Sequence, residues 1–143
     1  MLRNKKDSKA NKNVKKNTSS YLDQINPFVA GIDIGSRSHF VAAPVLNVEG
    51  KLEIEVREFS AFTSGLREMA DWLKECKVTS VAMESTGVYW ISSYELLESQ
   101  GFEVNLVDAR HVKNVTGRKT DIKDCQWIQQ LHACGLMGLL RTK

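Results

Sequence analysis

The first strands of the chain are indicated by the spacing of its apolar residues. Residues 28–34 are apolar with one acidic exception, which is typical of a buried central strand. Residues 39–46 predict a second strand, in which Pro44 indicates an edge or a bulge. Residues 52–59 alternate apolar and charged side chains, so they predict a half-exposed strand that follows a turn at Gly50. We expect these three strands to form an antiparallel meander.

The apolar spacing then becomes helical. Four apolar residues at positions i, i+3, i+4 and i+7 predict a helix that Thr63 or Ser64 caps and that ends near Cys76. They are Leu66, Met69, Ala70 and Leu73. Residues 78–83 predict a short buried strand, and Glu84 follows it directly.

Two more helices and one strand complete the pattern. A helix is predicted over residues 89–100, with Gly101 as its C-cap. Residues 103–107 predict a fifth strand. The last helix is predicted to begin near Asp121 and to bury three apolar side chains. These are Trp127, Ile128 and Leu131.

The predicted order is β-β-β-α-β-α-β-α, which is an α/β arrangement. It is the order of an RNase H-like domain, in which right-handed crossover helices add two parallel strands to an antiparallel meander. We therefore expect a mixed five-stranded sheet flanked by helices. A single domain is expected because 143 residues are too few for two domains of ordinary size.

Four acidic residues fall where this fold would bring them together. Asp33 lies within an apolar strand, where a charge without a partner is costly. Glu84 ends the parallel strand expected beside it, and Asp121 and Asp124 lie three residues apart on one helix face. Converging carboxylates can hold hard divalent cations for phosphoryl transfer. The pattern therefore indicates a site for Mg²⁺ or Mn²⁺.

Each of these acids also has a purely structural interpretation. Asp33 could hold a turn, Glu84 could cap a helix or pair with an arginine, and Asp121 could be an acid favoured by the helix dipole. Asp108, at the end of the fifth predicted strand, is the competing candidate for the site. We rank it lower because Asp121 and Asp124 occur as a pair on a helix.

The segment between the fifth predicted strand and the last predicted helix is rich in basic side chains. These are Arg110, His111, Lys113, Arg118, Lys119 and Lys123. A basic rim beside an acidic centre suits a phosphodiester substrate, because the rim can hold the flanking phosphates. A solvated loop is the alternative interpretation. We expect His111 to contact phosphate or solvent rather than a metal ion.

The net charge of +3 divides unevenly along the chain. Residues 1–20 hold seven basic residues and one acidic residue, whereas residues 21–143 hold 13 basic and 16 acidic residues. An arm rich in lysine, asparagine and serine cannot bury enough apolar surface to fold. Residues 1–26 are therefore expected to be a disordered basic tail that adds salt-sensitive attraction to phosphates. A solubilising role and an early start codon are the alternatives.

The sequence favours a cytoplasmic protein. Residues 1–20 contain no apolar run of the kind found in secretory signals, and the apolar cluster at 135–140 is far below membrane-spanning length. Cys76, Cys125 and Cys134 form no CxxC pair, so we expect reduced thiols rather than disulfides or a zinc site. Cys125 would need a partner histidine to act as a nucleophile, and the sequence places none beside it.

Four segments resemble, in order and spacing, the N-terminal domain of the DEDD insertion-sequence transposases, the group related to the Piv DNA invertase. These are GIDIGSRSH, AMESTGVYW, VDARHVKNVTGRKTDIKD and QWIQQLHACGLM. The resemblance extends from about residue 28 to residue 140. It implies a Mg²⁺-binding, RuvC-like domain over residues 27–143. The family's catalytic acids then correspond to Asp33, Glu84, Asp121 and Asp124.

The resemblance also implies an activity and its partners. Members of the family cleave and rejoin DNA strands during transposition, and the group is associated with guidance by a bridge RNA and with homo-oligomers. Members are much longer, however, and a C-terminal domain supplies a nucleophilic serine. Ser85, Ser92 and Ser93 lie in the first domain and do not fit that role. We therefore expect a C-terminally truncated domain that keeps the metal site and lacks transposition activity.

Two other functions stay open. The segment GIDIGS after a strand also resembles the first phosphate loop of actin-like and sugar-kinase-like ATPases. Those proteins need a second phosphate loop and an adenosine site further along the chain. The other alternative is a noncatalytic fragment that binds nucleic acid or dimerises with an intact relative.

Overall fold

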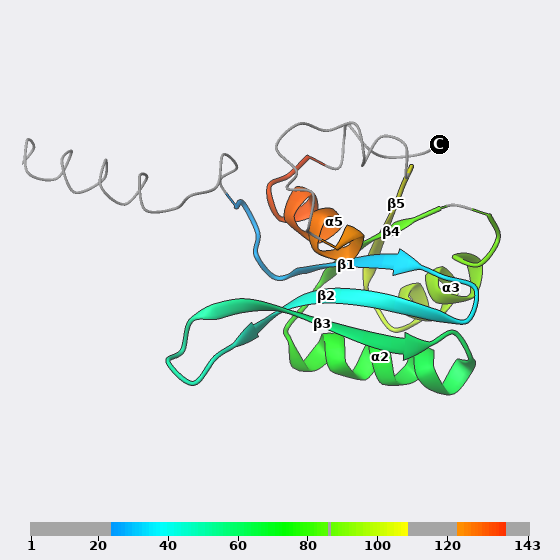
Figure 1. Cartoon of the computed structure of the whole chain (residues 1–143), viewed down its shortest axis with the longest axis horizontal. Helices are drawn as coiled ribbons and strands as arrows, with labels where there is room; N and C mark the ends of the chain where they lie inside the picture. Colours follow the sequence, from blue (N-terminus) through cyan, green and yellow to red (C-terminus); the bar gives the residue numbers. More distant parts are fainter. Residues whose placement is uncertain (1–23, 86, 109–122, 137–143) are drawn as a thin grey trace, which may run out of the picture.

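The computed structural model describes residues 24–85, 87–108 and 123–136, whose elements follow the predicted order β-β-β-α-β-α-β-α (Figure 1). The strands are β1 (Val29–Ile34), β2 (Ser38–Leu46), β3 (Leu52–Ser60), β4 (Ser80–Glu84) and β5 (Glu103–Val107). The helices are α2 (Thr63–Glu75), α3 (Ile91–Ser99) and α5 (Asp124–Ala133).

The strands form one mixed sheet in the order β3-β2-β1-β4-β5. β1, β2 and β3 pair in antiparallel fashion, and β4 and β5 continue the sheet parallel to β1. The expected meander with two added parallel strands is therefore confirmed. α2 and α3 cover one face of the sheet, and α5 lies on the other face, across β1 (Figure 1).

The alternation of side chains along the strands decides which residues face α5. Ile32 and Met83 belong to the larger core cluster, which the sheet shares with α2 and α3. Because successive side chains point to opposite faces of a sheet, Asp33 and Glu84 point to the α5 face. Ala82 supports this assignment, since it packs with apolar residues of α5 in the second core cluster.

α5 buries its apolar face as the sequence predicts. Trp127, Ile128 and Leu131 have no exposed surface and pack against Ala82 and Val107. The amide of Gln129, also buried, donates a hydrogen bond of 3.0 Å to the carbonyl oxygen of Val29 in β1. This bond ties the middle of the helix to the backbone of the central strand.

Gly31 is the point of closest approach between α5 and the sheet. A Cβ atom at this position would come within 3.0 Å of the Cys125 carbonyl oxygen and of the Gln129 backbone. Real Cβ atoms essentially never come so close, and helix backbone cannot turn aside as a flexible side chain can. Glycine in this strand therefore allows the helix backbone to rest directly on the strand.

Two details of the predicted elements need correction. The first residue before α2 is Phe62, with no side-chain capping bond, so the cap predicted at Thr63 or Ser64 is wrong. The backbone N–H of Phe62 instead donates to the Ser60 hydroxyl at 3.1 Å, and this bond holds the chain before the helix begins. α3 begins at Ile91, slightly later than predicted, after a turn.

The start of α5 also differs from the prediction. The sequence predicts that this helix begins near Asp121, but it begins at Asp124, because the backbone of Lys123 is extended. The expected placing of Asp121 and Asp124 on one face of this helix is therefore wrong.

Pro44 lies near the end of β2, where the sequence predicts an edge or a bulge. β1 pairs with β2 only as far as Ala42, so Pro44 lies where β3 is the sole paired neighbour of β2. The missing N–H of proline is tolerated there because one side of β2 is locally an edge. In the turn that follows this end of β2, Gly50 has a φ of 80°, which confirms its predicted place in the turn.

Replacing Gly31 with alanine is expected to destabilise the fold by about 3 kcal/mol or more, because the new methyl group overlaps helix backbone. Gly50→Ala is the matched control. Its methyl group would meet nothing within 4 Å, so only the cost of a left-handed backbone, about 1 kcal/mol, is expected. Urea unfolding of both variants measures the difference. Equal losses of stability would show that the close contact at Gly31 is unimportant.

His39 gives the fold a predicted dependence on pH. Its ring is buried in β2, and the Gly35 N–H donates to its Nδ1 at 3.1 Å. Burial lowers the pKa of His39, against the smaller raising effect of a hydrogen bond with the backbone of Ser38. The folded protein thus keeps this ring neutral, whereas the unfolded chain takes up a proton below about pH 6.5.

The contribution of His39 to stability is therefore full above about pH 6.5 and falls as the pH drops below it. His39→Asn keeps an acceptor near the place of Nδ1 but does not titrate. Urea unfolding at pH 7.5 and 5.5 should show a loss that is about 1 kcal/mol greater for the wild type than for the variant. Identical losses in the two proteins would contradict a buried, neutral His39.

Candidate metal centre

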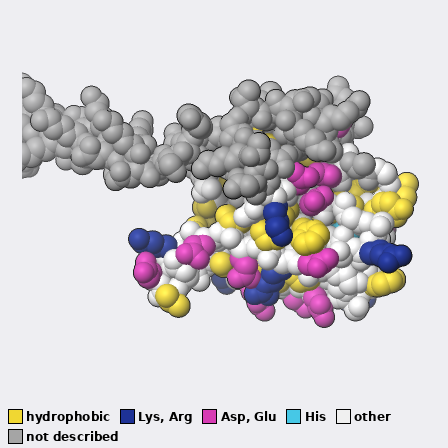
Figure 2. All heavy atoms as spheres, in the orientation of Figure 1, with side chains coloured by type: hydrophobic (Ala, Val, Ile, Leu, Met, Phe, Trp, Pro, Cys, Tyr) yellow, Lys and Arg dark blue, Asp and Glu magenta, His cyan; other side chains and the backbone are white. Residues whose placement is uncertain are grey.

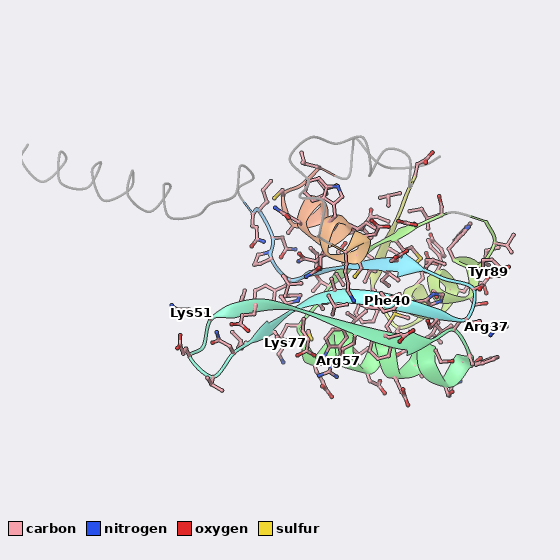
Figure 3. The ribbon with its side chains drawn as sticks, in the orientation of Figure 1. Arg37, Phe40, Lys51, Arg57, Lys77 and Tyr89 are labelled. Carbon is pink, nitrogen blue, oxygen red and sulfur yellow. The ribbon has the colours of Figure 1, made fainter. Side chains whose placement is uncertain are left out.

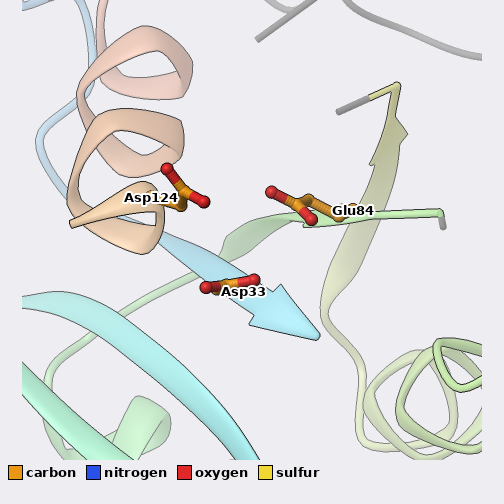
Figure 4. Close-up of side chains that lie close together, drawn as sticks. All are labelled: Asp33, Glu84 and Asp124. Atoms are coloured by element: carbon orange, nitrogen blue, oxygen red, sulfur yellow. The ribbon is translucent and has the colours of Figure 1, made fainter. Parts of the chain in front are cut away.

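Three of the four predicted acids come together on the α5 face of the sheet. Asp33 lies near the end of β1, Glu84 is the last residue of β4, and Asp124 is the first residue of α5. One carboxylate oxygen from each lies within 4.8 Å of the others. Figure 4 shows the three side chains pointing into the space between the two strands and the helix.

Strand register and helix packing produce this convergence. The parallel pairing of β1 and β4 matches Ile32 with Met83, so Asp33 and Glu84 follow a matched pair at the carboxyl ends of neighbouring strands. Asp124 reaches the same point because the backbone of α5 rests on Gly31, two residues before Asp33. The site is therefore assembled by secondary structure that is packed in the core.

The electrostatics of this arrangement favour a bound cation. Glu84 is buried, with 8% of its surface exposed, and Asp33 and Asp124 are half-buried. Two carboxylates about 4 Å apart repel by about 1 kcal/mol in water and by about 4 kcal/mol near a protein surface. The N-terminal end of α5 adds a favourable field for the charge on Asp124. A divalent cation between the three groups would offset their repulsion.

The donor set fits a hard cation. Mg²⁺ binds oxygen ligands at about 2.0–2.1 Å, which places ligands on opposite sides of the ion about 4.2 Å apart. Carboxylate oxygens within 4.8 Å of one another can reach this spacing by small side-chain rotations. The set contains oxygen donors only, and soft metals prefer sulfur or imidazole.

The remaining predicted site residues divide into two groups. Lys123 is described and exposed, and its ammonium lies over the ring of Phe40, 5.1 Å from the centroid. Asp108 is described as well, but it is outside the group of three acids. The fourth predicted acid, the other basic residues and the first 23 residues of the predicted tail lie outside the described residues. These are Asp121, Arg110, His111, Lys113, Arg118, Lys119 and residues 1–23.

Cys125 adjoins the site but is poorly suited to act as a nucleophile. Its side chain is buried, and all three cysteines are free thiols, as predicted. Burial raises the pKa of the Cys125 thiol to about 11, and the negative charge of Asp33 adds to the shift. The reactive thiolate is therefore scarce near neutral pH.

Sequence reasoning overlooked two residues that shape this site. Gly31 lets α5 approach, and a glycine inside a predicted strand is a signal that could have been used. Phe40 lies directly opposite Asp33 in the antiparallel pairing of β1 and β2. The alternation of β2 gives two possible faces for Phe40, but only the register shows which residue it faces.

The described residues contain no helix that is long and apolar enough to cross a membrane.

Solved structures with a similar fold include RuvC of Thermus thermophilus. It is 14% identical to this chain, with a TM-score of 0.54, and the match covers 79% of this chain and 98% of RuvC. The same values hold for that RuvC in complex with a Holliday junction substrate. The fowlpox virus Holliday junction resolvase is 11% identical over 78% of this chain and 97% of its own, with a TM-score of 0.41. The likeness to RuvC confirms the RNase H-like fold.

No curated protein matches the sequence. The family model of the IS110-type DEDD transposases, described as a transposase, matches residues 30–137. This match covers β1 to α5 and includes every predicted acid. It confirms the resemblance found in the sequence motifs, and the chain therefore belongs to the IS110-type family of DEDD transposases.

Proposed function

We propose that this domain binds Mg²⁺ or Mn²⁺ through Asp33, Glu84 and Asp124 and that it supplies the metal centre for the DNA strand cleavage of its transposase family. The observation that carries the proposal is the convergence of three carboxylates from β1, β4 and α5. Asp121 is proposed as a fourth ligand on the basis of its place in the family motif alone, because α5 begins only at Asp124.

The chemistry follows from the properties of the ligands. A bound divalent ion would polarise the reacting phosphate and favour ionisation of an attacking water or hydroxyl. Glu84, which is buried, and Asp33, which lies in a strand, would hold their oxygens in fixed directions. Such fixed groups need little rearrangement when charge develops during the reaction.

DNA is the proposed substrate because the family consists of transposases. A phosphodiester also suits the basic residues that the sequence places between β5 and α5, since they could hold the flanking phosphates. A guide RNA and a homo-oligomer stay predictions from the family resemblance. The actin-like ATPase alternative is disfavoured by the family match. The noncatalytic fragment is an outcome that the cleavage experiment below can reveal.

Calorimetric titration with Mn²⁺ tests the metal site. Asp33→Asn and Asp124→Asn should each weaken binding by at least about tenfold, since even outer-shell groups of metal sites are worth that much. Asp108→Asn is the matched control, because Asp108 is an acid at the end of β5 outside the group of three. Wild-type affinity in both site variants would refute the ligand assignment.

Cleavage itself is tested with the full chain and end-labelled DNA, both duplex and branched, in Mn²⁺ and in EDTA. We expect metal-dependent nicks from the wild type and from Asp108→Asn. We expect none from Asp33→Asn, because this variant lacks one of the proposed metal ligands. Metal binding and DNA binding without any nicks would favour the noncatalytic alternative over cleavage by this chain.

A further inference from the structure

Phe40 and Lys123 lie beside the three acids without belonging to them. Phe40 pairs with Asp33 across β1 and β2, and directly opposite residues in an antiparallel pair point to the same face of the sheet. Lys123 immediately precedes Asp124. The two side chains meet, since the Lys123 ammonium lies 5.1 Å from the centre of the Phe40 ring.

The backbone of Lys123 is fixed where α5 begins. Its N–H donates to the side-chain oxygen of Gln126 at 3.2 Å, and its carbonyl oxygen accepts from the Trp127 N–H at 3.1 Å. Only the four-carbon stem of the lysine keeps rotational freedom. The Phe40 ring therefore determines where the ammonium rests.

The ring leaves the hydrogen-bonding capacity of the ammonium available. An ammonium has three donors, and an aromatic face attracts its charge without accepting a strong hydrogen bond. Within the described residues there are two ion pairs, Lys51 with Glu49 and Arg57 with Glu55, and Lys123 is in neither. It is also exposed to solvent, so an incoming anion can reach it.

A second cation–ring contact in the protein differs from that of Lys123, because its cation also has a carboxylate partner. Arg57 lies over the Trp72 ring at 4.6 Å, on the side of the sheet that α2 covers, and it pairs with Glu55. The guanidinium of Arg57 already has a carboxylate partner, whereas the ammonium of Lys123 contacts the Phe40 ring and is in neither ion pair. Figure 3 labels both Phe40, on β2, and Arg57, on the side of the sheet where α2 lies. In the same orientation Figure 2 shows a basic side chain against hydrophobic ones near α5, with acidic ones beside it.

We propose that Phe40 is a positioning residue that holds the Lys123 ammonium beside the metal centre, where it contacts a phosphate of the DNA backbone next to the reacting one. The inference rests on the proposed function for its substrate. Lys123 would supply the contact, and Phe40 would act only through Lys123. This dependence distinguishes positioning from a general effect on folding.

The experiment measures binding of the full chain to a short fluorescein-labelled DNA duplex in EDTA, over a series of KCl concentrations. Loss of one phosphate contact lowers the slope of log K against log salt by about 0.9, which is about eightfold in affinity at about 0.1 M salt. That result is expected for Lys123→Gln. For Phe40→Leu we expect a loss of about two- to fivefold, the value of an exposed cation–ring contact.

Two further variants decide whether Phe40 acts through Lys123. The double variant Phe40→Leu with Lys123→Gln should bind no more weakly than Lys123→Gln alone. Phe40→Trp should keep wild-type affinity, because tryptophan gives the strongest cation–ring contact. Wild-type binding by Phe40→Leu, or an undiminished effect of that change in the Lys123→Gln background, would overturn the proposal.

The Mn²⁺ titration separates this inference from the proposed function. Lys123→Gln and Phe40→Leu should bind Mn²⁺ at least as well as the wild type, since neither removes a ligand and the first removes a repelling charge. A drop in their Mn²⁺ affinity would mean that the site itself is disturbed and would overturn the positioning role. If the wild type binds no Mn²⁺ while the Phe40 and Lys123 variants show the expected coupling on DNA, the metal proposal alone fails.

Discussion

The direct contact between the backbone of α5 and Gly31 of β1 determines the rest of this site. Side chains from both the helix and the sheet normally separate a helix from the sheet on which it packs. Here Gly31 has no Cβ atom, so the sheet contributes no side chain at this contact. Gln129 then reaches the Val29 carbonyl, and the first residue of the helix, Asp124, lies level with Asp33. A side chain at position 31 would move the helix and separate the acids.

On the same face of the sheet, the proposed metal centre has a cost in stability. Alternation places Ile32 and Met83 in the core and leaves Asp33 and Glu84 on the opposite face, where three carboxylates lie close together. An apolar residue at any of the three positions would avoid their mutual repulsion. Sites of this kind are where local rules of stability are broken in favour of chemistry. The large apolar core between the sheet and α2 and α3 supports this arrangement.

Much of this architecture was predictable because it depends on local periodicity. The strand and helix order followed from the spacing of apolar residues, and parallel strands bring their carboxyl ends to one edge, which placed Asp33 near Glu84. Features that depend on the exact register of the strands were not predicted. The register of β1 against β2 pairs Asp33 with Phe40, and nothing in the alternation of either strand fixes that register.

The predicted capping residue of α2 was wrong for a related reason. Thr63 and Ser64 are good capping residues by type, but the Ser60 hydroxyl already holds the backbone before the helix, and Phe62 takes the capping position. Competition between nearby hydroxyl groups is decided by backbone direction, which sequence type alone does not reveal. The role of Gly31, by contrast, could have been predicted from the sequence, because a glycine within a buried strand signals a close approach of backbone.

We propose that Asp33, Glu84 and Asp124 together bind one divalent ion. Anomalous diffraction from crystals of the full chain soaked in Mn²⁺ tests it most directly, because the metal is located without reference to activity. We expect an anomalous peak within bonding distance, about 2.0–2.6 Å, of an oxygen from each of the three carboxylates. A saturating soak with no peak between them, or with manganese bound only elsewhere, would contradict it.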